Sequence, residues 1–150
     1  MQDQPQGMER RMVHRLLMHW RKAQEIDETP TLDNVLAADL DDIEMCLYVL
    51  EVTSDEAEPV FERIGQAFAD EGTTALVGQP VSAASDTTLL GQAIRYYSKV
   101  QIKQIPITLG GEFTHDNGDI ILYRSIIMPV RDNDGDDRYL LGAANCKLKE

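Results

Sequence analysis

The sequence is short of cysteine, aromatic side chains and positive charge. Its 150 residues contain two cysteines, 6% aromatic residues, and 14 basic against 26 acidic side chains, which gives a formal net charge of −12. A chain this acidic repels the phosphates of nucleic acids and the headgroups of anionic lipids. We therefore expect neither a nucleic-acid-binding protein nor a membrane-surface protein.

Long apolar runs and paired cysteines are also missing. No run approaches the roughly 20 residues that a helix needs to cross a bilayer, and the first residues lack the apolar stretch of a secretory signal. We expect a cytoplasmic protein. Cys46 and Cys146 stand in apolar stretches without forming a CxxC pair, which is typical of reduced thiols and not of metal or redox motifs. A disulfide between them requires the fold to bring them together.

What the sequence does contain predicts one domain that begins with a helix. The apolar content of 43% suffices for a single packed core in a chain of this length. We expect a flexible arm over residues 1–7 and a single domain over residues 8–150, including a helix over residues 8–25. Apolar side chains recur there every three or four positions, opposite a basic face. Met12, Leu16 and Trp20 belong to this stripe, which either the same domain or a second copy must cover.

The remaining pattern predicts strands around a central helical stretch. Strands are predicted over five segments: 44–53, 60–64, 106–115, 119–130 and 139–148. A short helix is predicted over residues 32–40, and one longer helix over residues 89–104, ending ahead of a proline. Asn117-Gly118 suits a tight hairpin turn. This order predicts an α+β domain with an antiparallel sheet and helices largely on one face.

No arrangement of residues predicts catalytic or metal chemistry. Arg124 and Ser125 lie in mid-strand without a histidine that would act as a base. His14 and His19 are five positions apart and do not share the helix face that a metal site needs. Residues 132–137 place carboxylates like the opening of a calcium loop, but the later glycine and glutamate are absent, which favours a solvated turn. We expect neither an enzyme nor a metal protein.

Several short stretches carry a resemblance to a known family. They are Leu17 to Trp20, Phe61 to Gly65, Gly78 to Pro80, Gly91 to Val100, Pro106 to Phe113, Leu122 to Ile126 and Leu140 to Asn145. On these stretches, from about Leu16 to Lys147, the chain resembles short single-domain PAS proteins of α-proteobacteria. The stretches specify strands, turns and a helix, so the match bears on fold more than on function.

The resemblance implies a PAS-like five-stranded antiparallel sheet, with helices on one face and an N-terminal amphipathic helix. In many members a cavity between the longer helix and the sheet holds a small ligand. The residues that would line it here are Tyr48, Ile94, Tyr97, Tyr123 and Arg124. An N-terminal helix or the other face of the sheet makes a dimer or partner contact in the family, which here would use Met12, Leu16 and Trp20.

Two cofactors of PAS proteins are not supported by the sequence. Haem-binding members take an axial histidine from the longer helix, and residues 89–104 contain no histidine. Flavin photosensors carry a reactive cysteine in an Asn-Cys-Arg context on a helix, whereas Asn145-Cys146-Lys147 falls in the last predicted strand. The sequence leaves the cofactor unknown.

We expect a PAS-type sensory or regulatory module that acts in signal transduction by binding a small ligand, a protein partner, or both. The apolar stripe predicts a homodimer. No kinase, cyclase or DNA-binding part is attached, so the output is expected to pass to a separate protein. Two alternatives stay open: a small-molecule binding protein or uncharacterised enzyme that uses the same cavity, and a ligand-free adaptor.

Overall fold

A five-stranded antiparallel sheet forms the centre of the molecule. The computed structural model describes residues 4–37, 40–54, 56–132 and 138–149. The sheet has the strand order β2-β1-β5-β4-β3. Its strands are β1 (Leu47–Val52), β2 (Val60–Ile64), β3 (Ile107–Thr114), β4 (Ile120–Arg131) and β5 (Arg138–Leu148). The predicted α+β fold is confirmed, and the β2 bounds are those expected from its alternating pattern.

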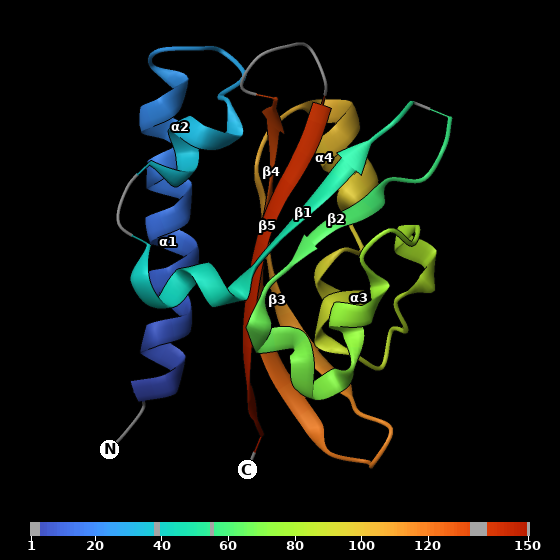
Figure 1. Ribbon diagram of the computed structural model, residues 1–150. Coiled ribbons are helices and arrows are strands. Elements are labelled where there is room, and N and C mark those ends of the chain that lie inside the picture. The colour runs from blue at the N-terminus through green and yellow to red at the C-terminus, as the bar shows by residue number, and fades with distance from the viewer. Residues whose placement is uncertain (1–3, 38–39, 55, 133–137, 150) are drawn as a thin grey trace.

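Helices cover both faces of this sheet (Figure 1). On one side, which we call the outer face, lie α1 (Gln4–Gln24) and α2 (Leu32–Leu36). On the other side, the inner face, lies a layer of short helices. This layer consists of the 3-10 helices η2 (Gln66–Glu71), η3 (Thr73–Leu76) and η4 (Val81–Ala83), and of α3 (Leu89–Ala93) and α4 (Tyr97–Lys103). A further 3-10 helix, η1 (Asp41–Cys46), leads into β1 and takes the first part of the predicted strand.

Strand β4 supplies side chains to both apolar cores. Ile121, Tyr123 and Ile127 belong to the core on the inner face. Ile126, Met128 and Val130 belong to the core on the outer face. Successive side chains of a strand point to opposite faces, so a sheet that is covered on both sides needs apolar residues in nearly every position. This explains why the segment that forms β4 is almost continuously apolar.

The outer face of the sheet covers the apolar stripe of α1. Met12, Leu16 and Trp20 are all nearly inaccessible, with exposed fractions of 5%, 0% and 3%. The indole Nε1 of Trp20 donates a buried hydrogen bond of 2.8 Å to the backbone carbonyl of Pro129 in β4. The stripe is therefore covered by the sheet of its own domain and not by a second copy. The assignment of these three side chains to a dimer contact therefore does not fit, because they are not on the surface; a homodimer stays a prediction.

Helix α1 starts earlier than the sequence suggested. The predicted arm over residues 1–7 is helical from Gln4 onward. Pro5 does not prevent this, because the first-turn N–H groups of a helix have no carbonyl partner within the helix and a proline there removes no hydrogen bond. The domain thus includes most of the segment that we expected to be flexible.

The predicted helix over residues 89–104 is two helices instead of one. The chain leaves helical geometry between α3 and α4, where Ile94 has φ −88° and ψ 0° and Tyr96 has φ −105° and ψ 22°. Both pieces contact β4 and β5. A straight helix of that length would lose contact with a twisted sheet at one end. The break between α3 and α4 lets each helix bury its own apolar side chains. The sequence pattern showed which residues face the core but not the break.

The two cysteines differ in their surroundings. Cys46 packs at the edge of the outer core, whereas Cys146 is exposed near the end of β5, paired in register with Tyr123. Neither forms a disulfide. The turn predicted over residues 132–137 falls, apart from Asp132, outside the described residues.

The Trp20 hydrogen bond yields a test of how α1 is held. We expect Trp20→Phe to lower the free energy of unfolding by about 2 kcal/mol, because the Pro129 carbonyl would stay buried without its donor. Urea unfolding followed by circular dichroism measures this, since Trp20 is the single tryptophan and cannot serve as the probe. Met18→Ala is the control, because Met18 lies on the same helix and is 48% exposed. Equal stabilities of the two variants would contradict the packing of α1 on the sheet.

Candidate ligand site on the inner face

Tyr48 occupies one part of the inner face. It lies on β1, is completely buried, and faces Gly142 of β5 across the strand pair. A Cβ atom at Gly142 would come within 2.1 Å of the Tyr48 ring, so only glycine leaves room for it. The hydroxyl donates to the backbone carbonyl of Ala93 in α3 at 3.4 Å. Burial raises the pKa of the Tyr48 phenol, which keeps the group protonated and able to donate.

Ser125 is a buried polar group of the inner face. It sits in the middle of β4, is fully buried, and its Oγ has no hydrogen-bond partner among the described residues. Its neighbours in register are Leu109 on β3 and Ala144 on β5, and α3 and α4 both contact the strands β4 and β5. A buried hydroxyl without a partner costs about 1 to 3 kcal/mol. The site therefore has a hydrogen-bonding group to offer to a bound molecule.

The predicted lining residues divide between the two faces. Tyr48, Ile94 and Tyr123 belong to the inner core, and Tyr97 packs against it. Burial also raises the pKa of the Tyr123 phenol, and the positive charge of nearby Arg95 partly offsets this by lowering the same pKa. Arg124 was wrongly placed in the cavity. It follows Tyr123 directly in β4, so strand alternation turns its side chain to the outer face, where it lines a groove beside α1.

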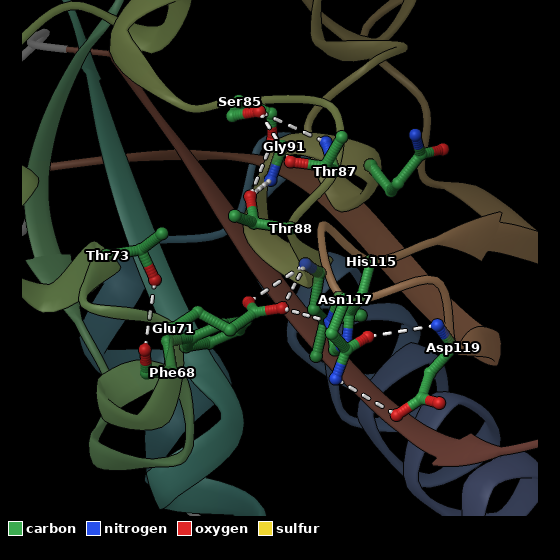
Figure 2. A network of polar contacts seen from close by, with 12 residues as sticks. Phe68, Glu71, Thr73, Ser85, Thr87, Thr88, Gly91, His115, Asn117 and Asp119 are labelled. Carbon is green, nitrogen blue, oxygen red and sulfur yellow. Dashed lines mark hydrogen bonds and ion pairs between the residues drawn. The ribbon is translucent and has the colours of Figure 1, made fainter.

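A polar network closes one rim of the inner face (Figure 2). The carboxylate of Glu71, in η2, accepts the backbone N–H of Leu89 at 2.9 Å to each oxygen. The same carboxylate lies 2.8 Å from Nε2 of His115, which follows β3. Three segments far apart in the sequence are thereby joined: η2, the start of α3 and the β3–β4 hairpin.

Aromatic contacts connect this rim to the inner core. The Phe113 ring meets the His115 ring edge to face, with centroids 5.2 Å apart. It meets the Tyr123 ring in the same way at 5.8 Å. Such pairs favour fixed relative orientations. The position of Tyr123, two residues from Ser125 on the same face, is therefore linked to the Glu71 network.

Sequence reasoning missed both Ser125 and Glu71 as parts of the candidate site. Ser125 was considered only as a nucleophile, and its signal was a single hydroxyl within an apolar strand. Glu71 had no signal, because its partners lie 18 and 44 positions away in the sequence. Within the described residues, His, Cys, Asp and Glu side chains do not gather in threes in a way that would hold a metal ion. None of the helices described is both long and apolar enough to cross a membrane.

The Glu71 network yields a stability prediction. We expect Glu71→Gln to lower the free energy of unfolding by about 1 kcal/mol, because charge-assisted hydrogen bonds are roughly twice as strong as neutral ones. Glu112→Gln removes the same charge from an exposed ion pair with Lys149 and should change stability by less than about 0.5 kcal/mol. Urea unfolding of both variants at neutral pH measures the difference. Equal losses would show that the Glu71 network does not hold the rim together.

Comparison with known proteins identifies the fold. No family model and no curated protein matches the sequence. Among solved structures, the dark state of the blue-light photoreceptor Aureochrome1 LOV is 12% identical, with a TM-score of 0.53 over 77% of this chain and 83% of that chain. A light-oxygen-voltage domain studied with a flavin analogue is 14% identical, with a TM-score of 0.51 over 75% of this chain and 83% of that chain. These domains belong to the PAS superfamily, so the similarity confirms the PAS-like fold.

The comparison also corrects one expectation from the sequence. We expected flavin not to be supported, because no cysteine stands in the helical context of flavin photosensors. That expectation is wrong, since the similar structures are light-oxygen-voltage domains and one of them was studied with a flavin analogue. The chain thus has a PAS-like fold, which it shares with these light-oxygen-voltage domains.

Proposed function

We propose that this chain is a sensory module that binds a small planar ligand between the sheet and the α3–α4 layer. The observation that carries the proposal is Ser125, whose hydroxyl is buried on the inner face without a partner among the described residues. A ligand that accepts or donates a hydrogen bond there would remove the cost of the unsatisfied group. Ligand sites are typically apolar with a few polar groups that fix orientation, and this face has that composition.

Flavin is the ligand class that we propose first. The support is the fold, together with the flavin analogue used with one similar structure. A flavin has apolar ring faces and polar ring edges. Ser125 would bind a polar edge, and Tyr123 and Ile127, on the same side of β4, would contact a ring face. Tyr48 already fills the space over Gly142, so the ligand would lie on the β4 side of the inner face. When bound, such a group would supply light absorption and electron transfer.

We propose that the module regulates a separate protein and catalyses no reaction itself. Strand β4 carries Ser125 on its inner face and Ile126 on its outer face, where Ile126 packs in the same core as Leu16 of α1. A ligand at Ser125 would therefore act on the strand that also supports α1. The solvent side of α1 exposes basic residues such as Arg11 and Arg21 in an otherwise acidic protein. This side suits an acidic partner surface.

One observation favours a different function, that of a ligand-free adaptor. Several large side chains on the inner face are completely buried, which indicates that the core is well filled without a ligand. They are Tyr48, Phe61, Phe68 and Leu90. An adaptor would use the same outer surface for its partner and would have no small-molecule signal.

The proposal is tested by identifying any small molecule that copurifies with the protein and by measuring the binding of a flavin. The protein is prepared in dim light, its absorption spectrum is recorded, and the molecules released on denaturation are identified by mass spectrometry. Flavin mononucleotide is then titrated into ligand-free protein by calorimetry. We expect saturable binding, weakened about tenfold in Ser125→Ala through loss of one hydrogen bond.

The same substitution has an opposite effect on the ligand-free protein. Ser125→Ala should raise the free energy of unfolding of that protein by about 1 kcal/mol, because it removes an unsatisfied buried hydroxyl. Ser98→Ala, at an exposed position of α4, is the matched control and should change neither quantity. A preparation that releases no small molecule and does not bind the probe would favour the adaptor. Unchanged affinity in Ser125→Ala would remove Ser125 from the site.

A further inference from the structure

A groove on the outer face lies between α1 and the β3–β4 edge of the sheet. Its volume is about 400 Å³, within the range of small-molecule sites. It is lined by Val13, His14, Leu17, Thr108, Leu109, Gly110 and Arg124. Val13 and Leu17 form a half-buried apolar wall on α1, while the opposite wall comes from the sheet. The groove and the inner face lie on opposite sides of β4.

Arg124 is the charged group of this groove, and within the described part of the chain no other residue pairs with it. It is half-buried, and none of the described residues forms a hydrogen bond or an ion pair with it. Glu112 lies on the same face of the sheet, two residues along β3 from Gly110, but its carboxylate binds Lys149 at 3.1 Å. An arginine carries five N–H donors in a planar fork, which matches a carboxylate or phosphate group. In a chain with a net charge of −12, an uncompensated cation in a recess is a specific feature.

Gly110 provides the space in which the guanidinium lies. It pairs with Arg124 in the β3–β4 register. A Cβ atom at Gly110 would come within 2.9 Å of Nη1 and 3.3 Å of Cδ of Arg124. The arginine side chain therefore lies over the glycine backbone and is positioned along the sheet. Any other residue at this position would displace the end of the arginine side chain while leaving the strand pairing intact.

We propose that this groove binds a small organic anion, with its anionic group on Arg124 and its apolar part against Val13 and Leu17. The charge of the groove selects the anionic group, and the apolar wall beside it selects an aliphatic or aromatic body over an inorganic ion. This site is separate from the inner-face site, because the two lie on opposite faces of the sheet. Its occupant would contact α1 and the sheet at once and would therefore strengthen their association.

Octanoate is a suitable probe, since it joins a carboxylate to an apolar chain. Nuclear magnetic resonance of the full-length, isotope-labelled protein should show saturable shifts of the backbone amides at Gly110 and Val13. Octylammonium, which has the same chain and the opposite charge, should cause no such shifts. Arg124→Gln should weaken octanoate binding by about tenfold or more. Gly110→Ala should weaken it severalfold, because the charge is kept but the guanidinium is displaced.

Arg11→Gln is the control for charge alone, because Arg11 is an exposed cation of α1 outside the groove. It should leave octanoate binding unchanged within about twofold. Equal weakening by Arg11→Gln and Arg124→Gln would mean a general charge effect and would overturn the proposal. So would an absence of saturable shifts, or shifts confined to inner-face amides such as that of Ala144. Inorganic phosphate binding as tightly as octanoate would refute the apolar part of the site.

Discussion

The β4 strand is packed on both faces, and the other elements are arranged around it. It pairs with β3 over the whole length of that strand and with β5 along the other edge. Its inward side chains meet the α3–α4 layer and its outward side chains meet α1. Whether a residue of β4 has an odd or an even number therefore decides which face of the sheet its side chain packs on. We call this property its parity. Apolar side chains fill nearly all of these positions, and the polar residues Ser125 and Arg124 stand out against them.

The polar groups on the two faces of the sheet differ in how their hydrogen-bonding needs are met. On the outer face, Trp20 donates to the Pro129 carbonyl, and Arg124 lines a groove. On the inner face, Tyr48 reaches the Ala93 carbonyl, but Ser125 reaches nothing in the described part of the chain. A hydroxyl that replaced an alanine or valine here would add no packing and would lower stability.

The sequence predicted the strands well because their signal is local. The alternating pattern fixed β2, and Asn117-Gly118 marked the β3–β4 turn, where Gly118 has φ 91°. The α1 stripe was correct as a buried surface, although periodicity does not say which surface covers it. The interruption between α3 and α4 depends on the twist of the sheet beneath, so helical spacing alone missed it. Arg124 was misplaced for a different reason: it is adjacent to Tyr123 in the sequence, and strand alternation puts neighbouring side chains on opposite faces of the sheet.

The parity of β4 also limits how this protein can change in length during evolution. One residue inserted between Tyr123 and Ile127 would turn every later side chain of β4 to the opposite face of the sheet. Side chains of the inner core would then face α1, and those of the outer core would face the α3–α4 layer. Substitutions can accumulate in this strand one at a time, but insertions and deletions cannot. Tolerated changes of length are expected at the exposed turn near Gly118 and in the connection between β1 and β2, where residues 53–54 and 56–58 are exposed. Related chains of different length should therefore align without gaps along β4 even where little else in their sequences agrees.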